Sequence, residues 1–178
     1  GYTNGFGSIN NTDLFVMKTN SNGELKWIKS YRNPNGGIYG NKILTINNNK
    51  LIMTGHTTGS LGGLGGEDLF LMELDTAGNI VWANVYGDSG NEQGLDIELH
   101  PNGYLIAGTS TSWGYGQGDI YLINTDLNGN VIDNCYSDVA SLIVTTNETI
   151  TVTSHVYAEG TFNLPINAPN LDTISIAT

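Results

Sequence analysis

Carboxylates are the side chains of this sequence best suited to catalysis. Seventeen acidic residues face six basic ones, and two carboxyl groups across a cleft are the machinery of glycosidases. The densest group of acids occupies one short segment: Asp88, Glu92, Asp96 and Glu98. The matching segment of an earlier copy of the same sequence pattern carries neutral residues instead: Asn33, Gly37 and Asn41. We therefore interpret the segment as a turn region and predict no catalytic residue.

The histidines and the Asp-containing turns are the candidates for binding a metal. His56, His100 and His155 lie far apart, and none shares a short motif with another His, a Cys or a carboxylate at ligand spacing. Residues 126–130 begin like a calcium loop, but the further ligands and the distal Glu of an EF-hand are missing. We predict surface or turn positions for the histidines, no metal site and no cofactor.

Two aromatic residues are candidates for binding a ligand. Trp113 and Tyr115 lie in a Gly-rich loop, residues 112–117, whose counterpart at 60–66 has no aromatic residue. Exposed rings beside flexible Gly can stack on a sugar or anchor a partner, and the alternative is packing within the loop. Trp27 and Trp82 differ from them because they recur at equivalent places, which predicts a packing role.

The overall composition excludes some partners. The net charge is −11 and only 13% of the residues are charged, so the chain cannot build the basic face that nucleic acid requires. An anionic membrane surface is disfavoured for the same reason. No run approaches 18 apolar residues, so we expect no membrane-spanning segment. The single Cys135 cannot form an internal disulfide.

A repeat of about 53 residues organises the chain, a period typical of solenoids, propellers and arrays. Each copy opens with Gly followed by a short polar run, at Gly1, Gly55 and Gly108. Each copy then has an Asp followed by apolar residues, at Asp13, Asp68 and Asp119. We predict that these aspartates cap backbone N–H groups of the preceding loop. A turn of the D-x-x-G-N type follows at 75–79 and 126–130, with a related turn at 20–24.

Each complete cycle predicts four short strands. In the last cycle they are residues 94–99, 104–109, 119–125 and 131–136, each closed by Gly or Asn. The turns place Gly where a hairpin needs positive φ. Residues 69–74 are apolar on both faces, which is typical of a sheet that is covered on both sides. Four-stranded antiparallel sheets stacked around an axis form a β-propeller. We therefore predict an all-β fold.

The spacing of these motifs resembles the β-propeller repeats of large secreted and surface proteins of Bacteroidota, which are exported by type IX secretion. The resemblance covers about residues 1–136 and implies a partial blade at 1–32 and further blades at 38–86 and 94–136. About two and a half blades cannot close a ring of four to eight. We expect either further blades upstream in the same protein or several chains that complete one ring.

Two features lie outside the repeat. Residues 138–178 contain no further copy and alternate Thr with Ile and Val, which predicts a β-rich tail, a linker or the start of another module. Thr76 and Thr173 each stand in an Asp-Thr-apolar sequence that resembles the O-glycosylation pattern of Bacteroidota. Both features fit a protein that is secreted or displayed at the cell surface.

The sequence favours a structural function over an enzymatic one. We expect a non-enzymatic scaffold or adhesion segment of a larger exported protein, which contacts proteins or glycans at the cell surface. One alternative is a carbohydrate-binding or carbohydrate-active propeller that uses Trp113 and Tyr115. Another is a subunit that completes a propeller by oligomerising.

Overall fold

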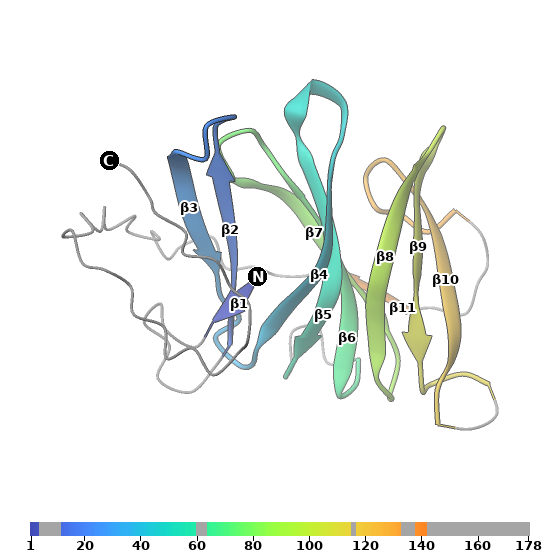
Figure 1. Cartoon of the computed structure of the whole chain (residues 1–178). Coiled ribbons are helices and arrows are strands. Elements are labelled where there is room, and N and C mark those ends of the chain that lie inside the picture. Colours follow the sequence, from blue (N-terminus) through green and yellow to red (C-terminus); the bar gives the residue numbers. More distant parts are fainter. Residues whose placement is uncertain (4–11, 60–63, 115–116, 133–137, 142–178) are drawn as a thin grey trace, which may run out of the picture.

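The chain folds into three antiparallel sheets that stand side by side (Figure 1). The computed structural model describes residues 1–3, 12–59, 64–114, 117–132 and 138–141. Apart from one short 3-10 turn, every regular element in these ranges is a strand. The predicted all-β fold with antiparallel sheets is confirmed.

The sheets follow one another in chain order. The first sheet contains β1 (Tyr2–Thr3), β2 (Asp13–Thr19) and β3 (Leu25–Tyr31). The central sheet contains β4 (Ile38–Thr45), β5 (Leu51–Thr58), β6 (Glu67–Leu74) and β7 (Ile80–Gly87). The third sheet contains β8 (Glu92–His100), β9 (Gly103–Ser110) and β10 (Asp119–Asp126). Within each sheet, these consecutive strands pair antiparallel with one another.

The turn that closes each repeat has the predicted geometry. Gly23, Gly78 and Gly129 have φ values of 84°, 76° and 79°, which side chains with a Cβ rarely adopt. Asp75 Oδ1 accepts the backbone N–H groups of Ala77 and Asn79, both at 2.8 Å. Asp126 makes the same bonds one repeat later. These carboxylates are therefore occupied by their own turns.

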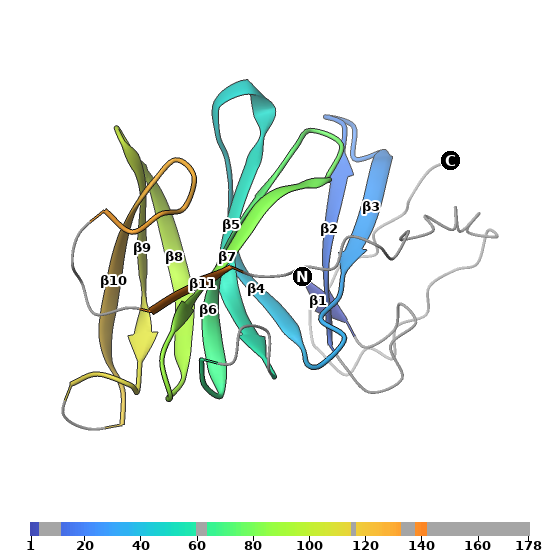
Figure 2. The same cartoon turned by 180° about the vertical axis from the view of Figure 1, so that it is seen from behind.

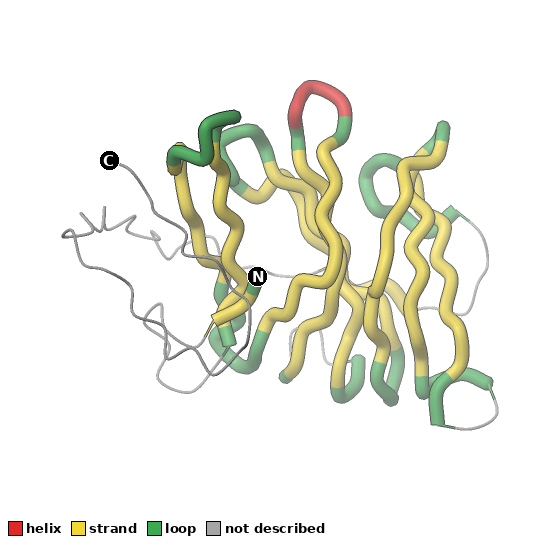
Figure 3. Tube along the Cα trace, in the orientation of Figure 1, coloured by secondary structure: helices red, strands yellow, loops and turns green. Residues whose placement is uncertain are grey.

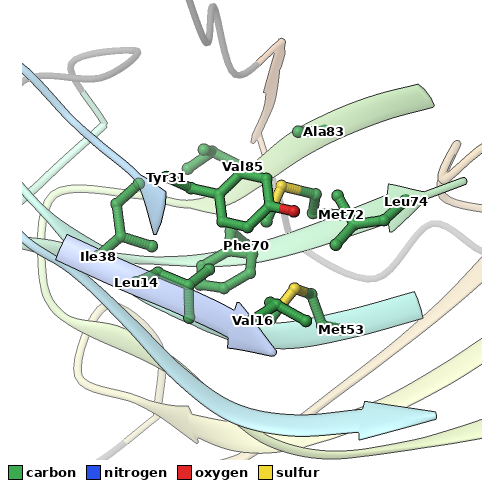
Figure 4. Packing of buried hydrophobic residues seen from close by; sticks show 10 residues of the cluster. All are labelled: Leu14, Val16, Tyr31, Ile38, Met53, Phe70, Met72, Leu74, Ala83 and Val85. Atoms are coloured by element: carbon green, nitrogen blue, oxygen red, sulfur yellow. The ribbon is translucent and has the colours of Figure 1, made fainter. Parts of the chain in front are cut away.

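The first interface, between the first and central sheets, is apolar. Leu14, Val16 and Tyr31 of the first sheet pack against side chains of the central sheet (Figure 4). The central sheet contributes Ile38, Met53, Phe70, Met72, Leu74, Ala83 and Val85. All of these residues are buried, so this cluster is one half of the hydrophobic core.

The second interface, between the central and third sheets, is built from the opposite face of the same central strands. Leu69 and Leu71 alternate with Phe70 and Met72 along β6 and point the other way. They pack with Ile52 and Tyr86 against residues of the third sheet, namely Ile97, Tyr104, Ile106, Tyr121 and Ile123. The prediction that residues 69–74 are covered on both faces is confirmed.

The two interfaces share a hydrogen bond that recurs with the repeat. The Tyr31 hydroxyl donates to the carbonyl of Gly78 at 2.7 Å, and the Tyr86 hydroxyl donates to the carbonyl of Gly129 at 2.5 Å. In each case the last Tyr of one sheet reaches the turn Gly of the next sheet. Trp27 extends this pattern, since its indole N–H donates to the Thr76 carbonyl at 3.2 Å. The packing role predicted for the recurrent tryptophans agrees with this contact.

The central sheet carries one strand from beyond the third sheet. Strand β11 (Asp138–Ser141) pairs antiparallel with β7 and forms the outer edge of the central sheet (Figure 2). On the opposite edge, η1 (Asn47–Asn49) connects β4 to β5 (Figure 3). Across the described residues the sheets form a row and do not close a ring. Residues 142–178, which include most of the predicted tail, lie outside the described ranges.

Candidate functional site

The predicted ligand-binding loop is described only in part. Trp113 is half-buried, and its ring packs against Tyr121 with ring centroids 5.0 Å apart. It also adds to the apolar cluster of the second interface. Tyr115 lies outside the described residues. One face of the Trp113 ring is therefore engaged within the protein, and sugar binding through this loop stays a prediction.

The predicted glycosylation sites differ in what the structure describes. Thr76 is exposed in the turn that follows β6. Its carbonyl accepts the indole N–H of Trp27 and lies 3.4 Å from Lys18 Nζ. Its position on the surface leaves the side chain accessible to modification. Thr173 lies outside the described residues.

The acidic segment does not form a pair across a cleft. Asp96 and Glu98 are exposed on β8, and Asp96 Oδ1 makes a 2.7 Å ion pair with Lys42 Nζ. The bond from Lys42 is the main reason why the pKa of Asp96 lies below its ordinary value. Glu92, in contrast, is fully buried at the start of β8. Asp96 and Glu98 are therefore exposed to solvent, whereas Glu92 is enclosed in the protein.

Two histidines can be placed. His100 is exposed at the end of β8, next to the β8–β9 turn. His56 lies on β5 with its ring stacked on Tyr39, at a centroid separation of 4.7 Å. Burial lowers the pKa of His56, so it is mainly neutral at pH 7, and its Nδ1 has no hydrogen-bond partner. His155 lies outside the described residues.

A shallow hollow of about 280 Å³ lies between β2 and β4. Phe15, Met17, Ile43 and Met53 contribute most of its apolar lining, and Lys42 stands at its edge. No carboxylate, His or Cys lines it. The hollow can accommodate an apolar group, but it offers no acid–base pair.

Three buried acids, Asp13, Asp68 and Glu92, lie at corners of the two interfaces, where the repeat Asp begins its strand. The first corner consists of Asp13, Arg32 and Ile38. Asp13 is fully buried, and its two oxygens lie 3.4 Å and 3.3 Å from Nε and Nη2 of Arg32. A guanidinium group matches a carboxylate with two parallel bonds, so this corner neutralises its own charge.

The second corner consists of the equivalent residues Asp68, Gly87 and Glu92. The strand register establishes the equivalence. Leu14 pairs with Tyr31 as Leu69 pairs with Tyr86, so Arg32 and Gly87 each follow the paired Tyr. In the same way, Ile38 opposes Thr57 on β5, and Glu92 opposes Ser110 on β9. At the second corner, Gly87 therefore takes the place of Arg32, and the acid Glu92 takes the place of the apolar Ile38.

Asp68 is the exceptional residue of the second corner. It is 1% exposed, and neither of its carboxylate oxygens has a hydrogen-bond partner. The capping role predicted for the repeat aspartates is wrong at this position, because the Asp68 carboxylate accepts no hydrogen bond. A buried charge without partners is costly. Burial first, and then the negative charge of Glu92, raises the pKa of Asp68 to about 6.

Glu92 is held firmly by three donors. Its Oε1 accepts the Ser110 hydroxyl at 2.7 Å and the Ser112 N–H at 3.3 Å, and its Oε2 accepts the Asp88 N–H at 2.9 Å. Donors of this kind stabilise a carboxylate. Glu92 is therefore a fixed, charged neighbour of Asp68.

Glu73 is a fourth buried acid among the described residues, and its charge is compensated by a neighbouring cation. Glu73 is 4% exposed and makes a 2.6 Å ion pair with Lys50. The Tyr104 hydroxyl donates to its other oxygen at 3.4 Å, and burial followed by the charge of Glu73 raises the pKa of Tyr104 to about 12. Only the second corner, among the described residues, buries two acids together without a cationic side chain.

Reasoning from the sequence missed the pairing of Asp68 with Glu92. The two residues are 24 positions apart, on strands of different sheets. A comparison of the repeat copies contains a signal for this pair. Gly87 stands where the earlier copy has Arg32, and Glu92 stands where the earlier copy has Ile38. The two replacements together indicate that the second corner differs in charge from the first. Asp68 and Glu92 are too far apart in the sequence to be recognised as a pair from neighbouring residues.

Comparison of the chain with protein-family models and with curated proteins found no match. Within the described ranges the helical content is limited to η1, so no helix has the length or apolar character needed to cross a bilayer. No group of three or more His, Cys, Asp or Glu gathers among the described residues at metal-binding spacing.

Proposed function

We propose that this chain is a non-enzymatic scaffold segment of a β-propeller, in which repeat sheets stack face to face within a larger exported surface protein. The observation that carries the proposal is the repetition of one interface. Tyr31 and Gly78 at the first interface correspond to Tyr86 and Gly129 at the second. A contact that recurs with the sequence period is suited to the addition of further sheets of the same kind.

The outer face of the third sheet supports the same proposal. Three apolar residues there are exposed by 38%, 86% and 51%: Leu105, Ile120 and Leu122. Their equivalents one repeat earlier are buried by the third sheet: Ile52, Leu69 and Leu71. The third sheet thus exposes to solvent the face whose equivalent in the central sheet is covered by a neighbouring sheet. Contiguous apolar surface of this kind is typical of an interaction site.

The opposite end of the row presents the complementary face. Met17 on β2 is 56% exposed, whereas its equivalent Met72 is 2% exposed within the first interface. The exposed face of the first sheet therefore corresponds to the face of the central sheet in the first interface. The exposed face of the third sheet corresponds to the face of the central sheet in the second interface. Further sheets of the same protein, or of a second copy, are the partners that fit them.

Adhesion to proteins or glycans, and display at the cell surface, complete the proposal. The support for export is the resemblance of the repeat and an acidic, Lys-poor composition with a net charge of −11. The support for a non-enzymatic role is the placement of the acidic segment, in which Asp96 and Glu98 are exposed on β8 whereas Glu92 is buried. The hollow beside β2 likewise has no acid–base pair.

The test is sedimentation velocity of the whole chain at micromolar concentrations. We expect the parent to self-associate through its end faces, and a variant with Ile120→Thr and Leu122→Thr to sediment as a monomer with an unchanged circular dichroism spectrum. Leu127→Thr is the matched control, because Leu127 is 50% exposed but lies in the β10 turn. A parent that remains monomeric would contradict stacking through this face. Turnover of a substrate that is lost on changing one acid would contradict the non-enzymatic role.

A further inference from the structure

The second corner differs from the first in lacking any positive charge of its own. The chain has six Lys and Arg residues, and all six lie in the described ranges: Lys18, Lys26, Lys29, Arg32, Lys42 and Lys50. Arg32, Lys42 and Lys50 form ion pairs with acids other than those of this corner. Lys18 and Lys29 bond to the turn that follows β6, and Lys26 is exposed on β3 in the first sheet. No basic side chain is left for Asp68 and Glu92.

The backbone at Gly87 lies close against both acids. An atom placed where a Cβ would stand on Gly87 would lie 2.5 Å from Asp68 Oδ1 and 2.7 Å from Glu92 Oε2. Both oxygens therefore point at the same bare stretch of backbone. At the first corner, the residue in this position is Arg32, whose guanidinium supplies the positive charge.

The donor atoms at this corner identify the class of ion. Two carboxylates supply only oxygen, and Ca²⁺ binds oxygen ligands at about 2.3–2.6 Å. Zn²⁺ prefers the nitrogen and sulfur of His and Cys, and neither residue belongs to this corner. Two buried negative charges also match the charge of one divalent cation.

We propose that the second corner binds a divalent cation of the Ca²⁺ type, held by the free oxygens of Asp68 and by Oε2 of Glu92. The cation takes the place that Arg32 fills at the first corner. It joins β6 of the central sheet to β8 of the third sheet and stabilises the second interface. Two carboxylates are fewer ligands than Ca²⁺ requires, so water and backbone carbonyls complete its shell.

The proposal is independent of the scaffold role, and its test uses the whole chain. After treatment with EDTA and its removal, the parent is titrated with CaCl₂ by calorimetry, and its Tm is followed by circular dichroism. An ion at about 100 times its Kd stabilises the folded state enough to raise the Tm by about 5–10 °C. Asp68→Asn should abolish both the heat of binding and the rise in Tm.

Asp13→Asn is the matched control, because it changes the equivalent Asp of the first corner and should leave the calcium response intact. Asn is close to Asp in shape, so Asp68→Asn should fold, and Glu92→Gln provides a second variant if it does not. A parent whose Tm is unchanged by Ca²⁺ would overturn the proposal. A response of equal size in both Asp68→Asn and Glu92→Gln would overturn it as well, because the ion would then bind elsewhere.

Discussion

At the first corner, Asp13 meets Arg32 of its own sheet, whereas at the second corner the equivalent Asp68 meets Glu92 of the next sheet. The surroundings are otherwise alike, since both interfaces bury a Leu beside the Asp and both bond a Tyr to a turn Gly. Apolar packing and the Tyr–Gly bond are thus the features that both interfaces share. The charged residues at the corner differ between the repeats, and the second corner places two acids together.

The largest effect should come from the part that the two interfaces share. Leu14 and Leu69 occupy equivalent positions and are 0% and 1% exposed. Changing either to Ala removes buried methyl groups and leaves a cavity, so each should lower the free energy of unfolding by about 2–5 kcal/mol in urea titrations. Ile120 is the equivalent residue on the outer face, and Ile120→Ala should change stability by about 0.5 kcal/mol or less. A much smaller cost at Leu69 than at Leu14 would break the equivalence of the interfaces.

The first corner should depend on its own cation. Arg32→Ala leaves the buried Asp13 without a partner and should cost about 2–3 kcal/mol. That is below the cost for a fully buried pair, because the Arg32 side chain is 35% exposed. Lys29→Ala, which removes an exposed bond to Asn79, is the control and should have a much smaller effect in the same urea titration. Equal losses in the two variants would mean that the charge of Asp13 does not need Arg32.

The second corner should make the metal-free protein less stable at neutral pH than at mildly acidic pH. The pKa of Asp68 is about 6 in the folded chain, above its ordinary value of 3.8, so the folded state holds this proton more tightly. The contribution of Asp68 to the free energy of unfolding therefore falls as the pH rises from about 4 to about 6 and stays level above that. The loss is on the order of 2–3 kcal/mol.

Urea titrations of the parent and of Asp68→Asn in EDTA measure this loss. The difference between the two pH profiles removes the contribution of His56, whose pKa is lowered by burial in both proteins. The difference should change across the interval from about pH 4 to about pH 6. A flat difference would show that Asp68 does not carry an unfavourable charge.

The smallest effect should be the same at both interfaces. Tyr31→Phe and Tyr86→Phe each remove one hydrogen bond to a turn carbonyl, at Gly78 and Gly129. Each change should cost about 1 kcal/mol by thermal unfolding. Tyr2→Phe is the control and should be neutral, because Tyr2 is 60% exposed. A cost at only one interface would show that the shared bond matters in one place and is incidental in the other.

Local patterns were enough to predict β8, β9, β10 and the turns, whereas most of the strand predicted at 131–136 lies outside the described residues. Gly23, Gly78 and Gly129 take positive φ because the chain must reverse within a few residues, and that requirement is visible in the D-x-x-G-N turns. The covering of residues 69–74 on both faces was predictable from apolar residues at consecutive positions. These features depend on neighbours in sequence.

Features that depend on packing between sheets could not be predicted in this way. The pairing of β11 with β7 brings together residues about 50 positions apart, and no turn residue announces it. The capping role predicted for Asp68 failed because its carboxylate accepts no hydrogen bond and lies close to Glu92 of the next sheet. Propeller closure, which depends on sheets beyond this row, stays a prediction.

The proposed cation at the second corner is tested most directly by a variant that gives this corner the residues of the first corner. The variant with Gly87→Arg and Glu92→Ile places beside Asp68 the two residue types that surround Asp13. Its Tm, measured in EDTA and again with excess Ca²⁺, should exceed that of the metal-free parent and should not respond to the ion. A rise with Ca²⁺ as large as that of the parent would contradict the claim that a cation at the second corner takes the place of Arg32.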